Sequence, residues 1–237
     1  MFDFHGKFTD RMLLPDGAVG FHPISYASRL YVAPAPAAWQ THAKRCFDMA
    51  MAVLCLVVLA VPMLAIALAI RRDSPGPALF RQRRIGQDGR PFVMLKFRTM
   101  RHSLTVEELR QATRGDPRIT GIGTWLRRTS FDEVPQFLNV LQGHMSVVGP
   151  RPHAPGTRAG GRLFEDVTPR YAERHRVKPG MTGLAQVRGW RGETDTEQKL
   201  LGRLTSDLDY IDSWSLGLDL LIVLRTIRLV ARMLNAY

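Results

Sequence analysis

An unbroken apolar segment constrains the fold of this chain more than any other feature. Between Met49 and Ile70 there are 22 residues without a formal charge, MAMAVLCLVVLAVPMLAIALAI. This run exceeds the length of about 18 residues that indicates a membrane helix. The sequence therefore predicts a helix embedded in a membrane, and a buried core helix is the less favoured alternative.

A proline within this segment and the charged residues on both sides of it indicate how such a helix would lie in a bilayer. Pro62 falls near its middle, where proline removes a backbone donor and kinks or breaks a helix. Lys44 and Arg45 precede the segment and Arg71 and Arg72 follow it, so both ends are drawn to the same anionic membrane face. Each half, at about 1.5 Å per residue, is too short for a hydrocarbon core of about 30 Å. These features favour a re-entrant helix hairpin, with an ordinary tilted span as the open alternative.

The remaining chain is long enough for one compact domain with an appendage. Residues 1–40 mix Gly, Pro, Ala and aromatic side chains without periodicity, which predicts a flexible tail. Residues 41–72 would form the membrane-embedded part, and residues 73–237 would form the compact domain. The start of the chain lacks the pattern of a secretory signal.

Charge and cysteine content narrow the class of protein. The chain has 33 Lys and Arg against 21 Asp and Glu, a formal net charge of +12. Such an excess indicates a polyanionic partner: nucleic acid, anionic lipid headgroups or phosphorylated substrates. Cys46 and Cys55 both lie in or beside the apolar segment, so neither a disulfide framework nor a thiolate metal site is predicted.

The pattern after the apolar segment predicts a β-hairpin in a helix-rich α+β fold. Ala78–Ile85 and Pro91–Phe97 are strand-like and flank Asp88 and Gly89, a pair typical of tight turns. Further helices are expected at Val106–Gln111, at Pro135–Leu141, from about Thr194 to Tyr210, and at Leu216–Leu234.

Two of these helices carry more specific signals. Thr194 and Glu197 have the spacing of a capping box, which places a helix start at Thr194. In the last helix, Arg225, Arg228 and Arg232 share one stripe on an otherwise apolar surface. That pattern fits a helix lying at a membrane surface, and packing on the protein's own core is an equal alternative.

The chemistry is expected in the segment Ser130–Pro152. It contains the adjacent acids Asp132 and Glu133, with Arg127, Arg128 and Arg151 around them in sequence. Adjacent helical residues diverge, so the acids are not predicted to act as a face-to-face dyad. If Asp132 lies at or near the start of the helix that contains Pro135, free backbone donors there could hold a phosphate while one carboxylate faces it. A simple N-cap role for Asp132 is the alternative.

Four motifs then carry a resemblance to a known family. The motifs that carry the resemblance are KFRTM (Lys96–Met100), DPRIT (Asp116–Thr120), SFDEVPQFLNVLQGHMSVVGPRP (Ser130–Pro152) and RHRVKPGMTGLAQVRGWRG (Arg174–Gly192). With these motifs, the chain resembles the bacterial sugar transferase family, the monotopic polyprenyl-phosphate hexose-1-phosphate transferases. The resemblance covers roughly residues 41–235.

This resemblance implies an enzyme of exopolysaccharide initiation at the cytoplasmic face of the bacterial inner membrane. In the family, an aspartate at the position of Asp132 attacks the β-phosphate of a UDP-sugar, releases UMP and forms an aspartyl phosphosugar, which undecaprenyl phosphate intercepts. Glu133 is implied to assist through a Mg²⁺ ion. The segment Arg191–Leu220 is most similar to members that use UDP-glucose or UDP-galactose.

The same resemblance predicts a set of substrate-binding residues. Arg127 matches an arginine that meets the lipid phosphate, and Lys96 and Arg151 match positions for phosphate or diphosphate contacts. Arg98 and Gln186 also match motif positions and complete the predicted binding set. Arg174, His175 and Lys178 match as well, although for these residues and for Arg98 a solvated basic surface is the commoner role of a charged side chain. Gly180 and Gly183 are expected to serve tight backbone geometry.

Three departures from the family pattern leave alternatives open. His144 stands where the family usually has an acid, which allows an inactive membrane-anchored scaffold. Val61 stands where the family often has a serine before the proline, which weakens support for a helix break. Many members have further domains before the catalytic part, so the chain resembles the minimal form. A nucleic-acid-binding protein is the remaining alternative, although no recognisable nucleic-acid-binding motif accompanies the charge.

Overall fold

The computed structural model describes residues 38–101 and 116–235, with side chains for residues 41–101 and 116–231. The tail predicted over residues 1–40 lies outside this part except for its last three residues, which belong to the first helix. The helix predicted at Val106–Gln111 also lies outside it.

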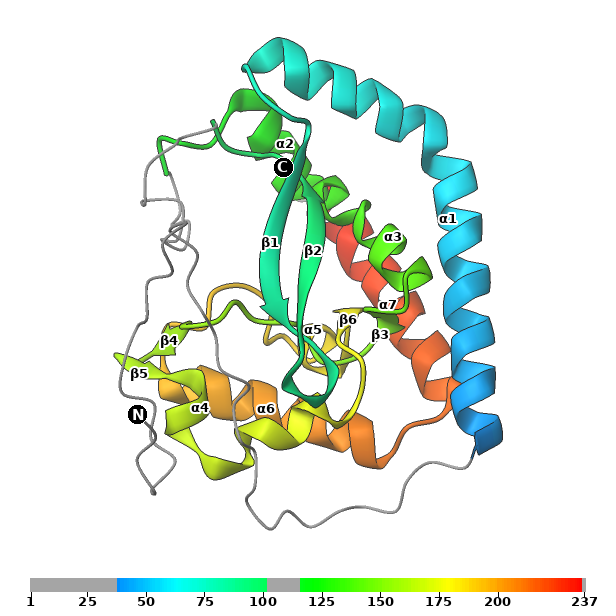
Figure 1. Ribbon diagram of the computed structural model, residues 1–237, viewed down its shortest axis with the longest axis vertical. Coiled ribbons are helices and arrows are strands. Elements are labelled where there is room, and N and C mark those ends of the chain that lie inside the picture. Colours follow the sequence, from blue (N-terminus) through cyan, green and yellow to red (C-terminus); the bar gives the residue numbers. More distant parts are fainter. Residues whose placement is uncertain (1–37, 102–115, 236–237) are drawn as a thin grey trace, which may run out of the picture.

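In the described residues, helices are interspersed with short strands that pair into three small two-stranded sheets (Figure 1). The elements are α1 (Ala38–Asp73), β1 (Leu79–Ile85), the 3₁₀ turn η1 (Gln87–Gly89), β2 (Pro91–Phe97), α2 (Gly121–Thr129), the 3₁₀ turn η3 (Phe131–Glu133), α3 (Gln136–Leu141), β3 (Ser146–Val148), β4 (Arg158–Ala159), β5 (Arg162–Leu163), α4 (Phe164–Val167), the 3₁₀ segment η4 (Pro169–Arg176), β6 (Gly180–Thr182), α5 (Leu184–Val187), α6 (Glu197–Asp212) and α7 (Leu216–Asn235). The helix-rich α+β class is as predicted.

The apolar segment lies in α1, a helix of 36 residues. The predicted break into two helices is not seen, because α1 continues through Pro62. Figure 1 shows instead a marked bend, after which the helix turns across the top of the molecule. A single proline removes one helical hydrogen bond and crowds the preceding turn, which bends a helix without ending it.

Both ends of α1 are attached to the same compact body. At the N-terminal end, Lys44 Nζ lies 2.8 Å from an Asp219 carboxylate oxygen in α7, and Asp48 accepts hydrogen bonds from the backbone and side chain of β3. At the C-terminal end, Ile66 and Ile70 pack in an apolar cluster with Phe97 of β2 and with α2. The two ends are therefore held while the middle of the helix projects.

That middle stretch is exposed in a way that excludes a buried core helix. Val57 and Val61 are 71% and 78% exposed, and only 11% of the most apolar window of the helix is buried. By length and composition the helix is suited to a membrane. Exposed aliphatic side chains of this kind are unfavourable in water and favourable in hydrocarbon.

The predicted hairpin is confirmed. β1 and β2 pair antiparallel from Leu79 opposite Phe97 to Ile85 opposite Pro91. Asp88 and Gly89 form the turn with positive φ angles of 54° and 72°. Asn, Asp and Gly are the residues that adopt this left-handed conformation most readily, which explains the turn at this pair.

A short parallel pair of strands, β3 and β6, lies at the centre of the body and was not predicted from sequence. Gly149 follows β3, and a side chain on Gly180 or Gly183 would meet its backbone at 2.1 or 2.3 Å. The expected tight-geometry role of these glycines is therefore confirmed. The main core surrounds this pair and includes Met145 and Val148.

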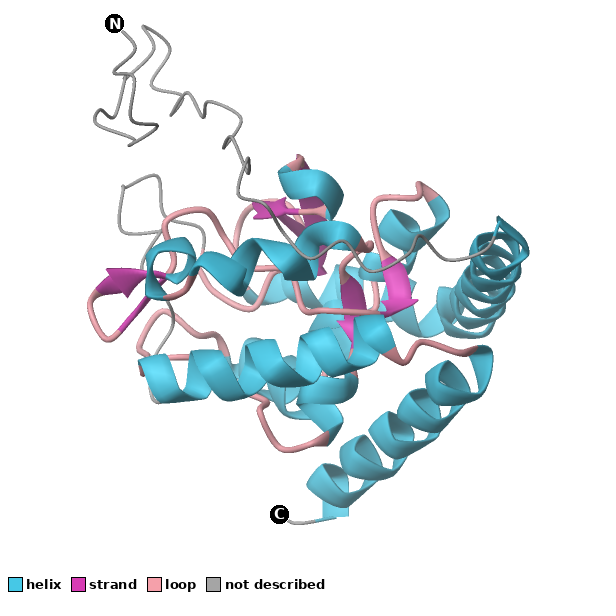
Figure 2. Ribbon diagram, turned by 90° about the horizontal axis from the view of Figure 1, so that it is seen from below, coloured by secondary structure: helices cyan, strands magenta, loops and turns pink. Residues whose placement is uncertain are grey.

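Helices α6 and α7 complete the body, with α1 seen end-on beside them in Figure 2. The start of α6 is two residues later than predicted, because Thr196 caps it through a hydrogen bond from the Lys199 backbone. Thr194 is buried before the helix. The predicted capping box of Thr194 and Glu197 is therefore wrong.

Candidate active site

Asp132 and Glu133 lie together on the short turn η3 between α2 and α3. The predicted helix start at Asp132 is wrong, because α3 begins at Gln136 with Pro135 as its N-cap. Ser130, which joins α2 to η3, has a φ of 61°, a left-handed conformation that is unfavourable for residues other than glycine. The two acids thus lie on a constrained turn. The positive charge that faces them comes from cationic side chains and not from a helix N-terminus.

Glu133 is the centre of a network of ion pairs. Its Oε1 accepts a hydrogen bond from Lys96 Nζ at 2.9 Å and another from Arg151. Its Oε2 accepts a second hydrogen bond from Arg151 at 3.1 Å. Burial raises the pKa of Glu133, but the charges and hydrogen bonds of Arg151 and Lys96 outweigh burial and hold this pKa well below its usual value. Glu133 is therefore ionised and binds both cations of the cluster.

Asp132 is placed differently from its neighbour. Its Oδ2 lies 3.9 Å from Lys96 Nζ, and among the described residues no group donates a hydrogen bond to its carboxylate. Burial raises the pKa of Asp132, while the positive charges of Lys96, Arg151 and Arg127 oppose this rise. The result is a carboxylate with unoccupied lone pairs beside a cationic cluster, which is the arrangement a nucleophile toward an anionic phosphate requires.

Arg127 extends the cationic cluster from α2. Its Nε donates a hydrogen bond to Thr99 Oγ1 at 2.8 Å, and Thr99 follows the end of β2. Asp132 and Asp116 both act electrostatically on Arg127, where their charges oppose the lowering of its pKa by burial. The structure thus brings four of the predicted residues to one place: Asp132, Glu133, Lys96 and Arg151, with Arg127 beside them.

The predicted binding role of Arg98 is not supported by its position. Arg98 is buried, and its guanidinium donates to the backbone carbonyls of Ile70, Ser74 and Pro75 at the end of α1. Cationic side chains commonly satisfy the last carbonyls of a helix in this way. Arg98 therefore anchors the end of the membrane helix.

Gln186 lies in a cleft that includes Glu133. The polar residues that line this cleft include Ser130, Glu133, Gln186 and Arg191. The Gln186 amide donates weakly to the Met181 carbonyl at 3.4 Å, and its own oxygen is buried without a partner among the described residues. Arg191, which was not predicted, donates a hydrogen bond to Ser130 Oγ at 2.7 Å. The signal for it was its place in the motif Arg174–Gly192.

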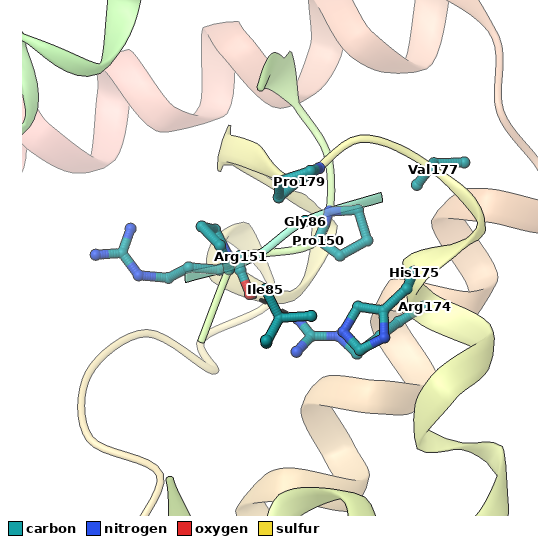
Figure 3. Close-up of a pocket in the computed structure, with 9 residues that line it drawn as sticks. Ile85, Gly86, Pro150, Arg151, Arg174, His175, Val177 and Pro179 are labelled. Atoms are coloured by element: carbon teal, nitrogen blue, oxygen red, sulfur yellow. Dashed lines mark hydrogen bonds between the residues drawn. The ribbon is translucent and has the colours of Figure 1, made fainter. Parts of the chain in front are cut away.

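Arg174 and His175 are buried, so neither the phosphate-contact nor the solvated-surface interpretation holds. Arg174 donates to Asp207 at 2.6 Å, to the Tyr171 hydroxyl at 2.6 Å and to the Arg151 carbonyl at 2.8 Å. Figure 3 shows the Arg174 guanidinium beside the Arg151 backbone, while the Arg151 side chain points away from it. This buried network fixes the backbone from which Arg151 reaches Glu133.

The oxygen atoms of the two acids could serve a magnesium ion. Mg²⁺ is usually held by one or two carboxylates together with substrate phosphates and water. Asp132 accepts no hydrogen bond among the described residues, and Glu133 Oε2 accepts one, so both retain ligand capacity. No larger group of metal-ligating side chains occurs in the described part of the chain. The donor set fits a substrate-assisted Mg²⁺ site.

His144 lies outside this network of ion pairs. It is exposed in the turn between α3 and β3, and its ring packs against that of Phe92 at a centroid distance of 6.0 Å. The departure from the family pattern at this position therefore falls on a surface turn.

The compact body holds both ends of an exposed apolar helix, which indicates a membrane-associated protein. Its carboxylate pair lies among cationic side chains, which suits the binding of anionic phosphates. The sequence model of the bacterial sugar transferase family matches residues 39–233. The chain belongs to this family.

Individual relatives agree with this assignment. The chain is similar to the exopolysaccharide production protein PSS of Rhizobium leguminosarum bv. phaseoli, with 51% identity over 78% of this chain and 92% of the relative. It is similar to the UDP-glucose:undecaprenyl-phosphate glucose-1-phosphate transferase of Caulobacter vibrioides, with 50% identity over 82% of this chain and 72% of the relative. It is 50% identical to the undecaprenyl-phosphate glucose phosphotransferase of Komagataeibacter xylinus over 80% of this chain, which spans 36% of that relative.

Proposed function

We propose that this protein transfers a hexose-1-phosphate from a UDP-sugar to undecaprenyl phosphate and so initiates an exopolysaccharide. UDP-glucose or UDP-galactose is the proposed donor. The observation that carries this proposal is the contrast between the two acids: Glu133 is held by two cations, whereas Asp132 keeps free lone pairs beside them. The names of the Caulobacter and Komagataeibacter relatives, both undecaprenyl-phosphate sugar transferases, support the reaction class.

In the first step, an Asp132 carboxylate oxygen would attack the β-phosphorus of the UDP-sugar. The bond between this phosphorus and the oxygen that bridges to UMP breaks, and UMP leaves with the electron pair. Lys96 and Arg151 would shift from Glu133 toward the diphosphate, where their charges stabilise the oxygens that gain negative charge. Mg²⁺ held by Glu133 and Asp132 would supply further neutralisation of the diphosphate.

In the second step, a phosphate oxygen of undecaprenyl phosphate would attack the phosphorus of the aspartyl phosphosugar. The bond to Asp132 breaks, the carboxylate is regenerated, and the product is a lipid-linked diphosphosugar. Arg127 is the proposed partner of the incoming lipid phosphate, because its guanidinium interacts electrostatically with Asp132 and an arginine is charged at neutral pH. Two displacements allow one small centre to serve two bulky anionic substrates in turn.

UMP release from purified protein in detergent tests this function. With Mg²⁺ and undecaprenyl phosphate, we expect UMP from UDP-glucose or UDP-galactose, and its loss when Mg²⁺ is chelated. A panel of other UDP-sugars defines the donor. Absence of UMP with every UDP-sugar in the panel would leave the inactive-scaffold alternative.

The acid limb of the pH profile should depend on Lys96. Asp132 acts as a carboxylate, so kcat/KM for the UDP-sugar falls as pH drops through its pKa, which burial raises above 3.8. Lys96 lowers that pKa, so Lys96→Met should move the acid limb to higher pH. Lys199→Met removes an exposed lysine paired with Asp195 and should leave the limb in place. An unchanged acid limb of kcat/KM in Lys96→Met would contradict the assignment of this limb to the Asp132 carboxylate.

We further propose that α1 is re-entrant at the cytoplasmic face of the inner membrane. Its two ends are attached to one body, through Lys44 and Asp48 at the start and Arg98 at the end. A helix that crossed the bilayer would separate those ends by about 30 Å of hydrocarbon.

Labelling from one side of sealed, oriented vesicles tests this topology. Cys55→Ser leaves Cys46 as the only cysteine, near the start of α1. Cys46→Ser with Cys55→Ser and Arg72→Cys places one near its end instead. We expect a membrane-impermeant maleimide to label both variants from the same side as a reference cysteine in the body, Ser213→Cys. Labelling of the two ends from opposite sides would establish a span.

A further inference from the structure

The cleft that includes Glu133 is lined by two chemically different sets of side chains, from different elements of the fold. The polar set, called here the polar end, includes Glu133 of η3 and Arg191. The apolar set, called here the apolar end, includes Val187 of α5 together with Leu229 and Val230 of α7. These three aliphatic side chains are only partly buried. A cleft of this kind complements a ligand that joins an anionic head to a hydrocarbon chain.

The helix that supplies Leu229 and Val230 to the apolar end also has exposed aliphatic side chains. α7 lines the cleft with Leu229 and Val230, while its Leu220, Leu224 and Ile227 are 52%, 56% and 60% exposed. The exposed aliphatic face of α7 and the exposed middle of α1 thus belong to helices that frame the same body (Figures 1 and 2). A lipid could pass from the bilayer to the cleft along the aliphatic side chains of α7, beside its exposed Arg225 and Arg228.

The polar end supplies the groups that a phosphate head requires. Arg191 donates to Ser130 Oγ, and Ser130 lies two residues before Asp132. The buried Gln186 oxygen has no partner among the described residues, so it could accept a hydrogen bond from a hydroxyl or from water that accompanies the head. α2, which carries Arg127, also contacts α7. The head of a ligand in this cleft would therefore lie at Arg191 and Ser130, beside the turn η3 that carries Asp132.

We infer that the cleft between α5 and α7 holds the first isoprenyl units of the polyprenyl phosphate acceptor, with Arg191 as a binding residue at its phosphate end. The inference rests on the proposed function and adds a separate site for the acceptor chain. A UDP-sugar is polar throughout and has no group that matches Val187, Leu229 and Val230. The donor would therefore use the cations at Glu133, and the acceptor alone would use the apolar end.

Filling the cleft should separate the two half-reactions. Val187→Trp places a large ring in the apolar end and should raise the KM for undecaprenyl phosphate by about tenfold, the loss expected when about two methylene groups no longer bind. Exchange of labelled UMP into the UDP-sugar, measured without acceptor, should stay within about twofold of the parent chain. Leu201→Trp introduces the same ring at an exposed leucine of α6 and should change neither quantity.

A short acceptor distinguishes this site from general membrane attachment. Because only the first units are held, farnesyl phosphate in detergent should show the same rise in KM with Val187→Trp. Leu229→Asn, which makes the wall polar without adding bulk, should give the same selective effect if the tryptophan variant fails to fold. An unchanged acceptor KM, or equal losses in both half-reactions for both variants, would overturn the inference. Absence of UMP exchange in the parent chain would instead defeat the proposed function itself.

Discussion

Asp132→Asn should abolish sugar-1-phosphate transfer, with a loss of at least about a thousandfold in turnover. The amide is nearly the same size as the carboxylate and leaves the ion pairs of Glu133 in place. It has no anionic oxygen with which to attack phosphorus, so the covalent step is lost. Release of UMP and formation of lipid-linked product should fall together, because both follow the first displacement.

Asp88→Asn provides the matched control. Asp88 is exposed in the hairpin turn with a positive φ, a conformation that asparagine adopts as readily as aspartate. The control should retain full activity. A substantial residual turnover in Asp132→Asn, well above the contamination level set by a purified empty-vector sample, would show that another group acts as the nucleophile.

Asp207→Leu should destabilise the protein by about 3–5 kcal/mol, because it leaves a buried charge without its partner. Arg174 is 3% exposed and Asp207 2% exposed, and their atoms lie 2.6 Å apart. Without Asp207, the guanidinium stays buried and loses its countercharge. For a body of this size the thermal midpoint in detergent should fall by about 10 °C.

A double variant separates charge from packing. Arg174→Met combined with Asp207→Leu removes both charges, so it should be more stable than Asp207→Leu alone, although the Tyr171 hydroxyl and Arg151 carbonyl lose a donor. Asp212→Leu breaks the more exposed pair with Arg176 and should change stability by less than about 1 kcal/mol. If Asp207→Leu were no more destabilising than Asp212→Leu, the buried pair would not hold the body together.

The same network has a functional consequence. Arg174 donates to the Arg151 carbonyl, and the Arg151 side chain reaches Glu133 from that backbone. A substitution that displaces the Arg174 side chain would therefore alter the active site through Arg151 alone. Arg174 thus links the motif Arg174–Gly192 to the segment that carries the acids.

Local patterns predicted the elements whose signals lie close together in sequence. The hairpin follows from strand-like residues around Asp88 and Gly89, and the membrane helix follows from a long uncharged run. The start of α6 was misplaced because Thr194 and Thr196 are both good caps, and tertiary packing buries Thr194. Local rules do not contain that information.

Long-range pairings account for what was missed. β3 and β6 have three residues each and meet only because the fold brings them together, so neither has a detectable period. The motif that contains Arg98 predicted a role in substrate binding. The Arg98 side chain instead binds the carbonyl of Ser74, 24 residues away in sequence at the end of α1. Around Asp132, Glu133 and the arginines Arg127 and Arg151 were expected from their proximity in sequence, whereas Lys96 was predicted only through the family resemblance.

The most direct test of the account is the mass of the intact protein after incubation with the UDP-sugar and Mg²⁺ in the absence of acceptor. The account predicts an increase equal to one hexose phosphate, located by fragmentation at Asp132 and removed when undecaprenyl phosphate is added. Formation of lipid-linked product with no adduct, or with an adduct at another residue, would contradict it.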